Sequence, residues 1–163
     1  DYIKAYLFLC KISNQKILKS IFFEGFAINS LINDENKIAI YNRATYYSFL
    51  KYCSLERLKK KKILLVGMLS WFEGQPLDKA NYIALNNFFP KVFKSAYCGI
   101  VGEIKNVSYV CNTEDEIAWG LAPDLLYVMG SNMQKSMRMY SDKVNVTVAP
   151  AFRFSSIWNY NYN

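Results

Sequence analysis

The sequence predicts an α/β fold: a three-layer, Rossmann-like lobe with a mainly parallel sheet, preceded by two amphipathic helices. The first observation is that short apolar runs of strand length alternate with helical segments in the second part of the chain. This alternation is typical of a parallel sheet with crossover helices. The second is that the 163-residue chain is 52% apolar, which is ample for a packed core.

The leading part of the chain shows helical rather than strand periodicity. Apolar residues at helical spacing predict amphipathic helices over residues 15–32 and 43–59. Between them, the NDEN stretch at 33–36 predicts a turn, and KIAIY at 37–41 predicts a short strand.

Four apolar runs are expected to form the sheet, over residues 63–69, 96–101, 125–129 and 144–148. A helix over 77–89 follows Pro76, a residue suited to a helix start. TEDE at 113–116 predicts a capping box that opens a short helix to about residue 121, and SNMQ at 131–134 predicts a second capping box.

These elements indicate a helical leading segment, residues 1–60, packed on a lobe of βα repeats over 61–158, with a polar tail at 159–163. We expect a single structural domain that belongs to a larger protein, because a lobe of this kind already occupies about 150 residues.

The charge and the cysteines narrow the classes of function. The net charge of +7 favours acidic partners, namely nucleotide diphosphates, anionic lipid head groups or nucleic acid. No RNP-like or zinc-finger pattern is present, so nucleic acid is not an expected partner.

The four cysteines form no C-x-x-C pair, which predicts buried free thiols in a reducing compartment and a cytoplasmic location.

The chain contains no histidine. This excludes Ser-His-Asp and Cys-His nucleophilic systems and H-E-x-x-H metallopeptidases within this chain. No metal site is expected, and acid–base chemistry would depend on carboxylates, Tyr or Lys.

The first candidate site is SWFEGQPLD, residues 70–78, which follows a predicted strand and leads into a helix. Ligands of open parallel sheets bind beyond the carboxyl ends of the strands. There Trp71 and Phe72 would wall a site, and Glu73 would accept a proton or hydrogen-bond a hydroxyl. The alternative is structural: Trp71 and Phe72 plug the top of the sheet, while Glu73 or Gln75 caps the helix.

The second candidate is VMGSN, residues 128–132, where a glycine again joins a strand to a helix. Backbone N–H groups around Gly130 would hold a phosphate or a sugar hydroxyl. Helix capping alone also explains this pattern.

Three segments in order carry a family resemblance: WFEGQPLDKA at 71–80, APDLLYVMG at 122–130 and VTVAPAFRF at 146–154. Together they resemble bacterial surface-carbohydrate biosynthesis proteins (O-antigen and capsule type) with a GT-B glycosyltransferase lobe. Two features depart from that family. AYCGIVGE at 96–103 lacks the histidine that many relatives carry there, and Met129 stands where Asn is usual.

The resemblance implies sugar transfer from a nucleotide-sugar donor, bound as a substrate, to a glycan acceptor, with no other cofactor. Glu73 would deprotonate the acceptor hydroxyl. Arg153 would meet an anionic ligand, or alternatively form a surface ion pair. The substrate-binding residues implied are Trp71, Gln75, Asp78, Gly130, Asn132 and Arg153.

The resemblance further implies a second lobe or a partner protein, because the transfer takes place in a cleft between two lobes. Two alternatives stay open. One is a non-catalytic binding or scaffold domain of a polysaccharide-assembly complex. The other is a basic peripheral module that docks on an anionic surface such as the inner membrane.

Overall fold

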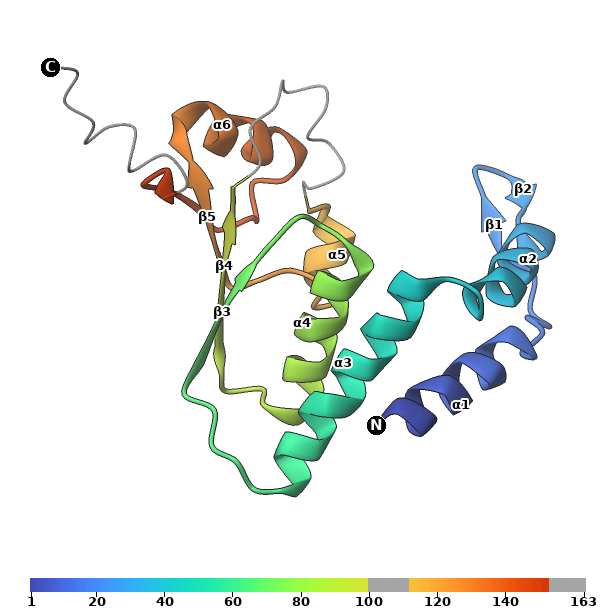
Figure 1. The fold of residues 1–163 in the computed structure, drawn as a ribbon. Coiled ribbons are helices and arrows are strands. Elements are labelled where there is room, and N and C mark those ends of the chain that lie inside the picture. Colours follow the sequence, from blue (N-terminus) through green and yellow to red (C-terminus); the bar gives the residue numbers. More distant parts are fainter. Residues whose placement is uncertain (100–111, 153–163) are drawn as a thin grey trace, which may run out of the picture. The chain divides into compact units, whose positions relative to one another are not determined.

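The computed structural model describes residues 1–99 and 112–152, and the chain divides into two compact units, residues 1–63 and 64–163 (Figure 1). In the described ranges, no helix is both long enough and apolar enough to cross a membrane.

The first unit consists of three helices and a small β-hairpin. Its elements are α1 (Tyr2–Ser13), β1 (Phe22–Phe23), β2 (Phe26–Ala27), α2 (Asn29–Ala39) and α3 (Arg43–Lys60). Helix α1 packs against α3, where the rings of Phe8 and Phe49 stack with centroids 5.8 Å apart. Around this contact the buried side chains are those of Ala5, Leu9, Cys53 and Leu55.

The predicted helix over 43–59 is confirmed as α3. Asn42 precedes it with extended backbone, and its side-chain oxygen accepts from the backbone N–H groups of Ala44 at 2.9 Å and Thr45 at 3.3 Å. These bonds satisfy donors that a helix start otherwise leaves unpaired. Three of the last four residues of α3 are basic, which suits the negative end of the helix dipole.

The predicted helix over 15–32 is wrong. Glu24 and Gly25 have φ values of 48° and 85° and form the two-residue turn of the hairpin β1–β2. The predicted turn at 33–36 and strand at 37–41 are wrong as well, because α2 runs through both to Ala39. Helix α1 lies in a segment where no helix was predicted.

The second unit confirms the predicted fold class. Four strands form one all-parallel sheet in the order β3-β4-β5-β6, flanked by helices, consistent with a three-layer Rossmann-like fold. The strands are β3 (Gly67–Trp71), β4 (Phe93–Cys98), β5 (Leu125–Met129) and β6 (Val146–Ala149), and the helices are α4 (Pro76–Phe88), α5 (Glu114–Ala118) and α6 (Gly130–Tyr140).

The strand positions follow the prediction closely only at β5, whose bounds agree at both ends. Strand β3 begins four residues later than predicted because pairing starts at Gly67 opposite Phe93, and the preceding Leu64 and Val66 are exposed. Strand β4 begins three residues earlier than predicted, and residues 100 and 101 of that prediction lie outside the described residues.

The core of the second unit lies between the sheet and its helices. Tyr82 of α4 and Met137 of α6 belong to the same buried cluster, together with alternate residues of the strands. Figure 1 shows α4 running alongside β3 and β4. The sheet residues of this cluster are Ala96, Cys98, Leu126, Val128 and Val146. This packing places the amino ends of α4 and α6 just beyond the carboxyl ends of the strands that precede them.

Candidate functional site

The carboxyl edge of the sheet is the candidate site. Strand β3 ends at Trp71 and leads into α4 at Pro76, while β5 ends at Met129 and leads directly into α6. In open parallel sheets the loops at this edge bind ligands, because strand ends and helix amino termini converge there.

Glu73 lies in the loop between β3 and α4, and both of its carboxylate oxygens accept hydrogen bonds. The indole N–H of Trp71 donates to Oε1 at 2.6 Å, and the side-chain amide of Gln75 donates to Oε2 at 3.1 Å. A carboxylate has about four lone-pair sites, so two donors leave it able to accept further bonds. Glu73 is half-buried and held in one orientation.

Asp78, rather than Glu73, receives the backbone donors at the start of α4. Its Oδ2 accepts from the backbone N–H of Glu73 at 2.9 Å and from that of Gln75 at 3.2 Å. Capping of α4 therefore needs no contribution from the Glu73 carboxylate. The two aromatic residues before it also differ: Phe72 is fully buried against Tyr82, whereas Trp71 is partly exposed at the edge.

Three aromatic rings form a row beside Glu73. The ring centroids of Trp71 and Tyr97 lie 5.5 Å apart, and those of Tyr97 and Phe152 lie 5.2 Å apart. The hydroxyl of Tyr97 donates to the carbonyl oxygen of Pro150 at 2.9 Å. The segment after β6 is thereby held against β4. Tyr97 itself is buried, whereas Trp71 and Phe152 on either side of it are 39% and 61% exposed.

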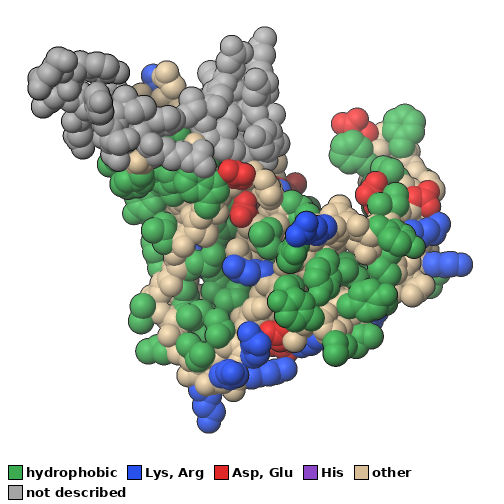
Figure 2. All heavy atoms as spheres, viewed as in Figure 1, with side chains coloured by type: hydrophobic (Ala, Val, Ile, Leu, Met, Phe, Trp, Pro, Cys, Tyr) green, Lys and Arg blue, Asp and Glu red, His purple; other side chains and the backbone are tan. Residues whose placement is uncertain are grey.

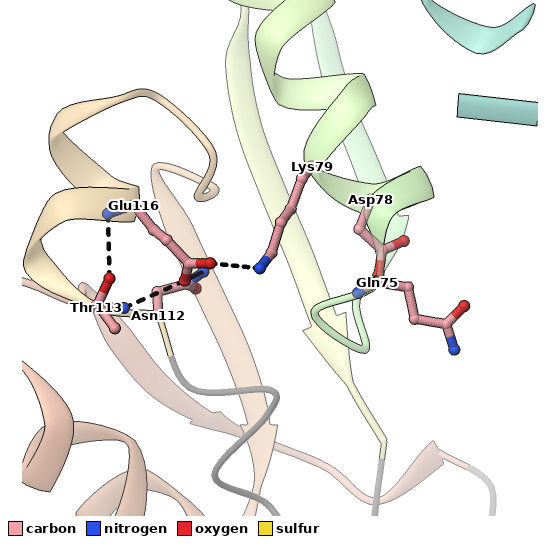
Figure 3. A network of polar contacts seen from close by, with 6 residues as sticks. All are labelled: Gln75, Asp78, Lys79, Asn112, Thr113 and Glu116. Atoms are coloured by element: carbon pink, nitrogen blue, oxygen red, sulfur yellow. Dashed lines mark hydrogen bonds and ion pairs between the residues drawn. The ribbon is translucent and has the colours of Figure 1, made fainter. Parts of the chain in front are cut away.

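A polar network links the first turn of α4 to the start of α5 (Figure 3). The ammonium group of Lys79 forms an ion pair with Glu116, whose carboxylate also accepts from the backbone N–H of Thr113 at 3.3 Å. The Thr113 hydroxyl accepts from the backbone N–H of Glu116 at 3.2 Å. The predicted capping box at 113–116 is therefore confirmed, although its helix ends at Ala118 rather than near residue 121.

The Glu116 carboxyl is perturbed by this network. Burial raises its pKa, but the hydrogen bond from the Lys79 ammonium and the bond from Thr113 outweigh burial and lower the pKa below its ordinary value. Glu116 is therefore charged at neutral pH and bound to its cation.

Asn112, next to this network, is 1% exposed. Its side-chain amide lies 3.5 Å from Oε2 of Glu116, while its Oδ1 has no hydrogen-bond partner among the described residues. A buried acceptor without a donor is costly in a folded protein.

Gly130 and Asn132 lie at the start of α6, at the same edge of the sheet. They follow β5, which is separated from β3 by β4, so about 10 Å of sheet lies between them and the end of β3. The predicted capping box at 131–134 is wrong: α6 begins at Gly130, Met129 is its N-cap, and no side chain caps it. Gly130 has a φ of 82°, and an added Cβ would meet no atom within 4 Å.

The site residues thus fall into two groups. Trp71, Glu73, Gln75 and Asp78 are joined by hydrogen bonds, while Gly130 and Asn132 belong to a separate strand end. Arg153 lies outside the described residues.

Sequence reasoning missed Lys79, Asn112, Tyr97 and Phe152 as site residues. No local pattern in the sequence identifies them, because only the fold brings Lys79 and Asn112 to Glu116. No metal-binding group of three His, Cys, Asp or Glu side chains occurs in residues 1–99 and 112–152.

No protein-family model matches the chain, and comparisons with curated proteins and with solved structures found no match.

Proposed function

We propose that this chain is part of a glycosyltransferase-like protein of bacterial surface-polysaccharide biosynthesis, in which the carboxyl edge of the second unit binds sugar. The observation that carries the proposal is the orientation of Glu73 by Trp71 and Gln75 beside the row of Trp71, Tyr97 and Phe152. The exposed rings of Trp71 and Phe152 offer apolar surface to a sugar ring, and the carboxylate offers an acceptor to its hydroxyls.

The proposed reaction is transfer from a nucleotide sugar to an acceptor hydroxyl. Glu73 takes the proton of that hydroxyl while the hydroxyl oxygen forms a bond to the anomeric carbon. The bond from the anomeric carbon to the diphosphate breaks, and the leaving nucleotide keeps the electron pair. Stabilising that anion is the role proposed for the uncapped amino end of α6 at Gly130, since helix N–H groups attract phosphate.

The three resembling segments support the proposal by where they lie. The first contains Trp71 and Glu73, the second ends at Gly130, and the third contains Pro150 and Phe152. Tyr97 contacts both Trp71 and Phe152, so the first and third segments meet through one side chain. A cytoplasmic location is part of the proposal, because Cys53 and Cys98 are buried free thiols of the kind that persist in reducing compartments.

A second candidate function is a non-catalytic glycan-binding or scaffold domain. It is favoured by one observation: both oxygens of Glu73 already accept hydrogen bonds, as they would in a purely structural role.

Glu73→Gln separates the two functions, because it keeps the size of the side chain and removes the base. Binding is measured by ligand-observed NMR with UDP-, GDP- and dTDP-sugars and with the surface glycan, and glycan production is measured in cells that carry the full-length gene. The catalytic proposal expects Glu73→Gln to keep binding and abolish glycan production.

The matched control is Glu114→Gln, which removes an exposed carboxylate of the same unit. It should leave both readouts unchanged. If Glu73→Gln also leaves glycan production intact, the scaffold function is correct. If no nucleotide sugar or glycan binds the unaltered protein, both functions are wrong.

A further inference from the structure

The hairpin β1–β2 of the first unit exposes large apolar side chains on both of its faces. Phe23 and Phe26 pair directly across the turn, and Phe22 pairs with Ala27 in the next position along the ladder. Because successive residues of a strand point to opposite faces, Phe22 lies on the other face from Phe23. The three phenylalanines are 64–75% exposed, and nearby Leu18 is 93% exposed.

The hairpin is nonetheless held in a defined place. The Asn29 side-chain oxygen accepts from the backbone N–H of Ile21 at 2.8 Å, and its amide donates to the carbonyl oxygen of Lys19 at 2.8 Å. The backbone N–H of Ile28 donates to the carbonyl oxygen of Ile21 at 3.0 Å, which closes the base of the hairpin. Figure 1 shows the hairpin projecting beyond α2, and Figure 2 shows hydrophobic side chains gathered over it.

The charge of the chain is concentrated on this unit. Residues 1–63 contain twelve Lys and Arg against five Asp and Glu, whereas residues 64–163 contain eight of each. The whole net charge of +7 therefore belongs to the first unit. Lys16 and Lys19, both exposed, lie in the segment that leads into the hairpin.

We propose that this hairpin inserts into the interface of an anionic lipid bilayer, with Lys16 and Lys19 at the level of the head groups. A flat protein surface would cover one face of the hairpin and leave Phe22 or the pair Phe23 and Phe26 in water. Immersion in the head-group and acyl boundary covers both faces at once. Basic residues beside the hairpin add attraction to anionic lipids.

Glu24 sets the depth of insertion. It occupies the turn, so its carboxylate would enter first, and a charge is costly in the hydrocarbon core. The insertion is therefore shallow. This inference is independent of the proposed function, because it depends only on residues of the first unit.

The experiment is flotation of the whole chain with vesicles of phosphatidylcholine alone and of phosphatidylcholine mixed with phosphatidylglycerol. We expect binding to the mixed vesicles only, and weaker binding as salt screens the lysines over about 10 Å at roughly 0.1 M. The double variant Phe23→Ser/Phe26→Ser should lower the partition coefficient at least about tenfold. Glu24→Gln should raise it, because the turn then enters without a charge.

The matched control is Ile3→Ser/Leu7→Ser on α1, which removes two apolar side chains of similar exposure, 77% and 61%. It should bind vesicles as the unaltered chain does. Circular dichroism checks that each variant is folded.

Four outcomes would overturn the inference. The first is no vesicle binding by the unaltered chain, and the second is equal loss in both double variants. The third is weaker vesicle binding by Glu24→Gln, which would show that the turn does not enter the bilayer. The fourth is a dimer that Phe23→Ser/Phe26→Ser turns into a monomer in sedimentation, because the hairpin would then be a contact with a second copy of the chain.

Discussion

The indole nitrogen of Trp71 lies 2.6 Å from Oε1 of Glu73, so the last residue of β3 orients the carboxylate that follows it two residues later. The Trp71 ring in turn lies against Tyr97 of the neighbouring strand. A rigid sheet therefore positions a carboxylate that stands in a loop, which is the arrangement that a binding or catalytic group requires.

Trp71→Phe tests this orientation, because it keeps an aromatic ring and removes the indole N–H. We expect the free energy of unfolding to fall by about 1 kcal/mol, the usual contribution of one hydrogen bond. Urea unfolding measures it, with Trp119→Phe as a control at an exposed tryptophan of the same unit. A double-mutant cycle with Glu73→Ala, which removes the acceptor of this bond, should give a coupling free energy of about 1 kcal/mol. Additive effects would show that the bond contributes nothing.

Gly99→Ala should destabilise the second unit by about 1–3 kcal/mol, the usual cost of overpacking. A Cβ at Gly99 would lie 2.2 Å from Cη2 of the Trp71 ring, so the ring must leave its place beside Tyr97 and Glu73. Near-ultraviolet circular dichroism should report the displaced indole, and urea unfolding should report the lost stability.

Gly67→Ala is the matched control for Gly99→Ala. Its added Cβ would lie 3.8 Å from the nearest atom, the carbonyl oxygen of Phe93, which is an ordinary contact. We expect a change within about 0.5 kcal/mol. In the Trp71→Phe background the cost of Gly99→Ala should shrink, because the shorter phenyl ring does not reach Gly99. An unchanged cost would show that the collision is not with the indole.

The fold class of the second unit could be predicted because several of its local signals agree with each other. The apolar run Leu125–Met129 is bounded by Asp124 and Gly130, and the strand has those same bounds. Pro76 begins α4, and Thr113 and Glu116 form their capping box. The start of β3 was harder to predict, because only pairing with Phe93 distinguishes Gly67 from the apolar residues before it.

The first unit was predicted less well because long-range side-chain bonds decide its conformation. Residues 15–32 show helical spacing, but Asn29 and Asn33 hydrogen-bond the backbone of residues 17–21 and hold it in a non-helical conformation. Gly25 was the local signal for a turn, and helical periodicity concealed it.

At the candidate site, Glu73 and its neighbours were predictable from one loop. Asn112 and Lys79 were not, because only the fold brings them together.

Lys79→Met should lower the free energy of unfolding at neutral pH by about 1 kcal/mol, because it leaves the mostly buried Glu116 carboxylate without its cation. The pKa of Glu116 is lowered in the folded chain, so the stability that this group contributes is present above its unfolded pKa of about 4.3. It is lost as pH falls through the folded pKa. The difference between Lys79→Met and the unaltered chain should therefore shrink in acid.

Urea unfolding at a series of pH values measures that difference. Lys143→Met is the matched control, because it removes the cation of an ion pair with Glu114 in which both side chains are largely exposed. Its effect at neutral pH should be smaller than that of Lys79→Met. A difference for Lys79→Met that stays constant through acid would show that Glu116 is not the partner responsible.

Tyr82 should remain protonated at a pH that ionises an ordinary tyrosine. Burial raises its pKa to about 12, and its hydroxyl lies 3.0 Å from that of Ser70. The folded pKa exceeds the unfolded value of about 10, so the stability that this group contributes is complete below pH 10 and is lost as pH rises toward 12. Tyr82→Phe removes the group, and should make stability fall less steeply across that window. The difference in phenolate absorbance between the unaltered chain and Tyr82→Phe gives the pKa of Tyr82. Ionisation of Tyr82 near pH 10 in the folded chain would contradict its burial in the core.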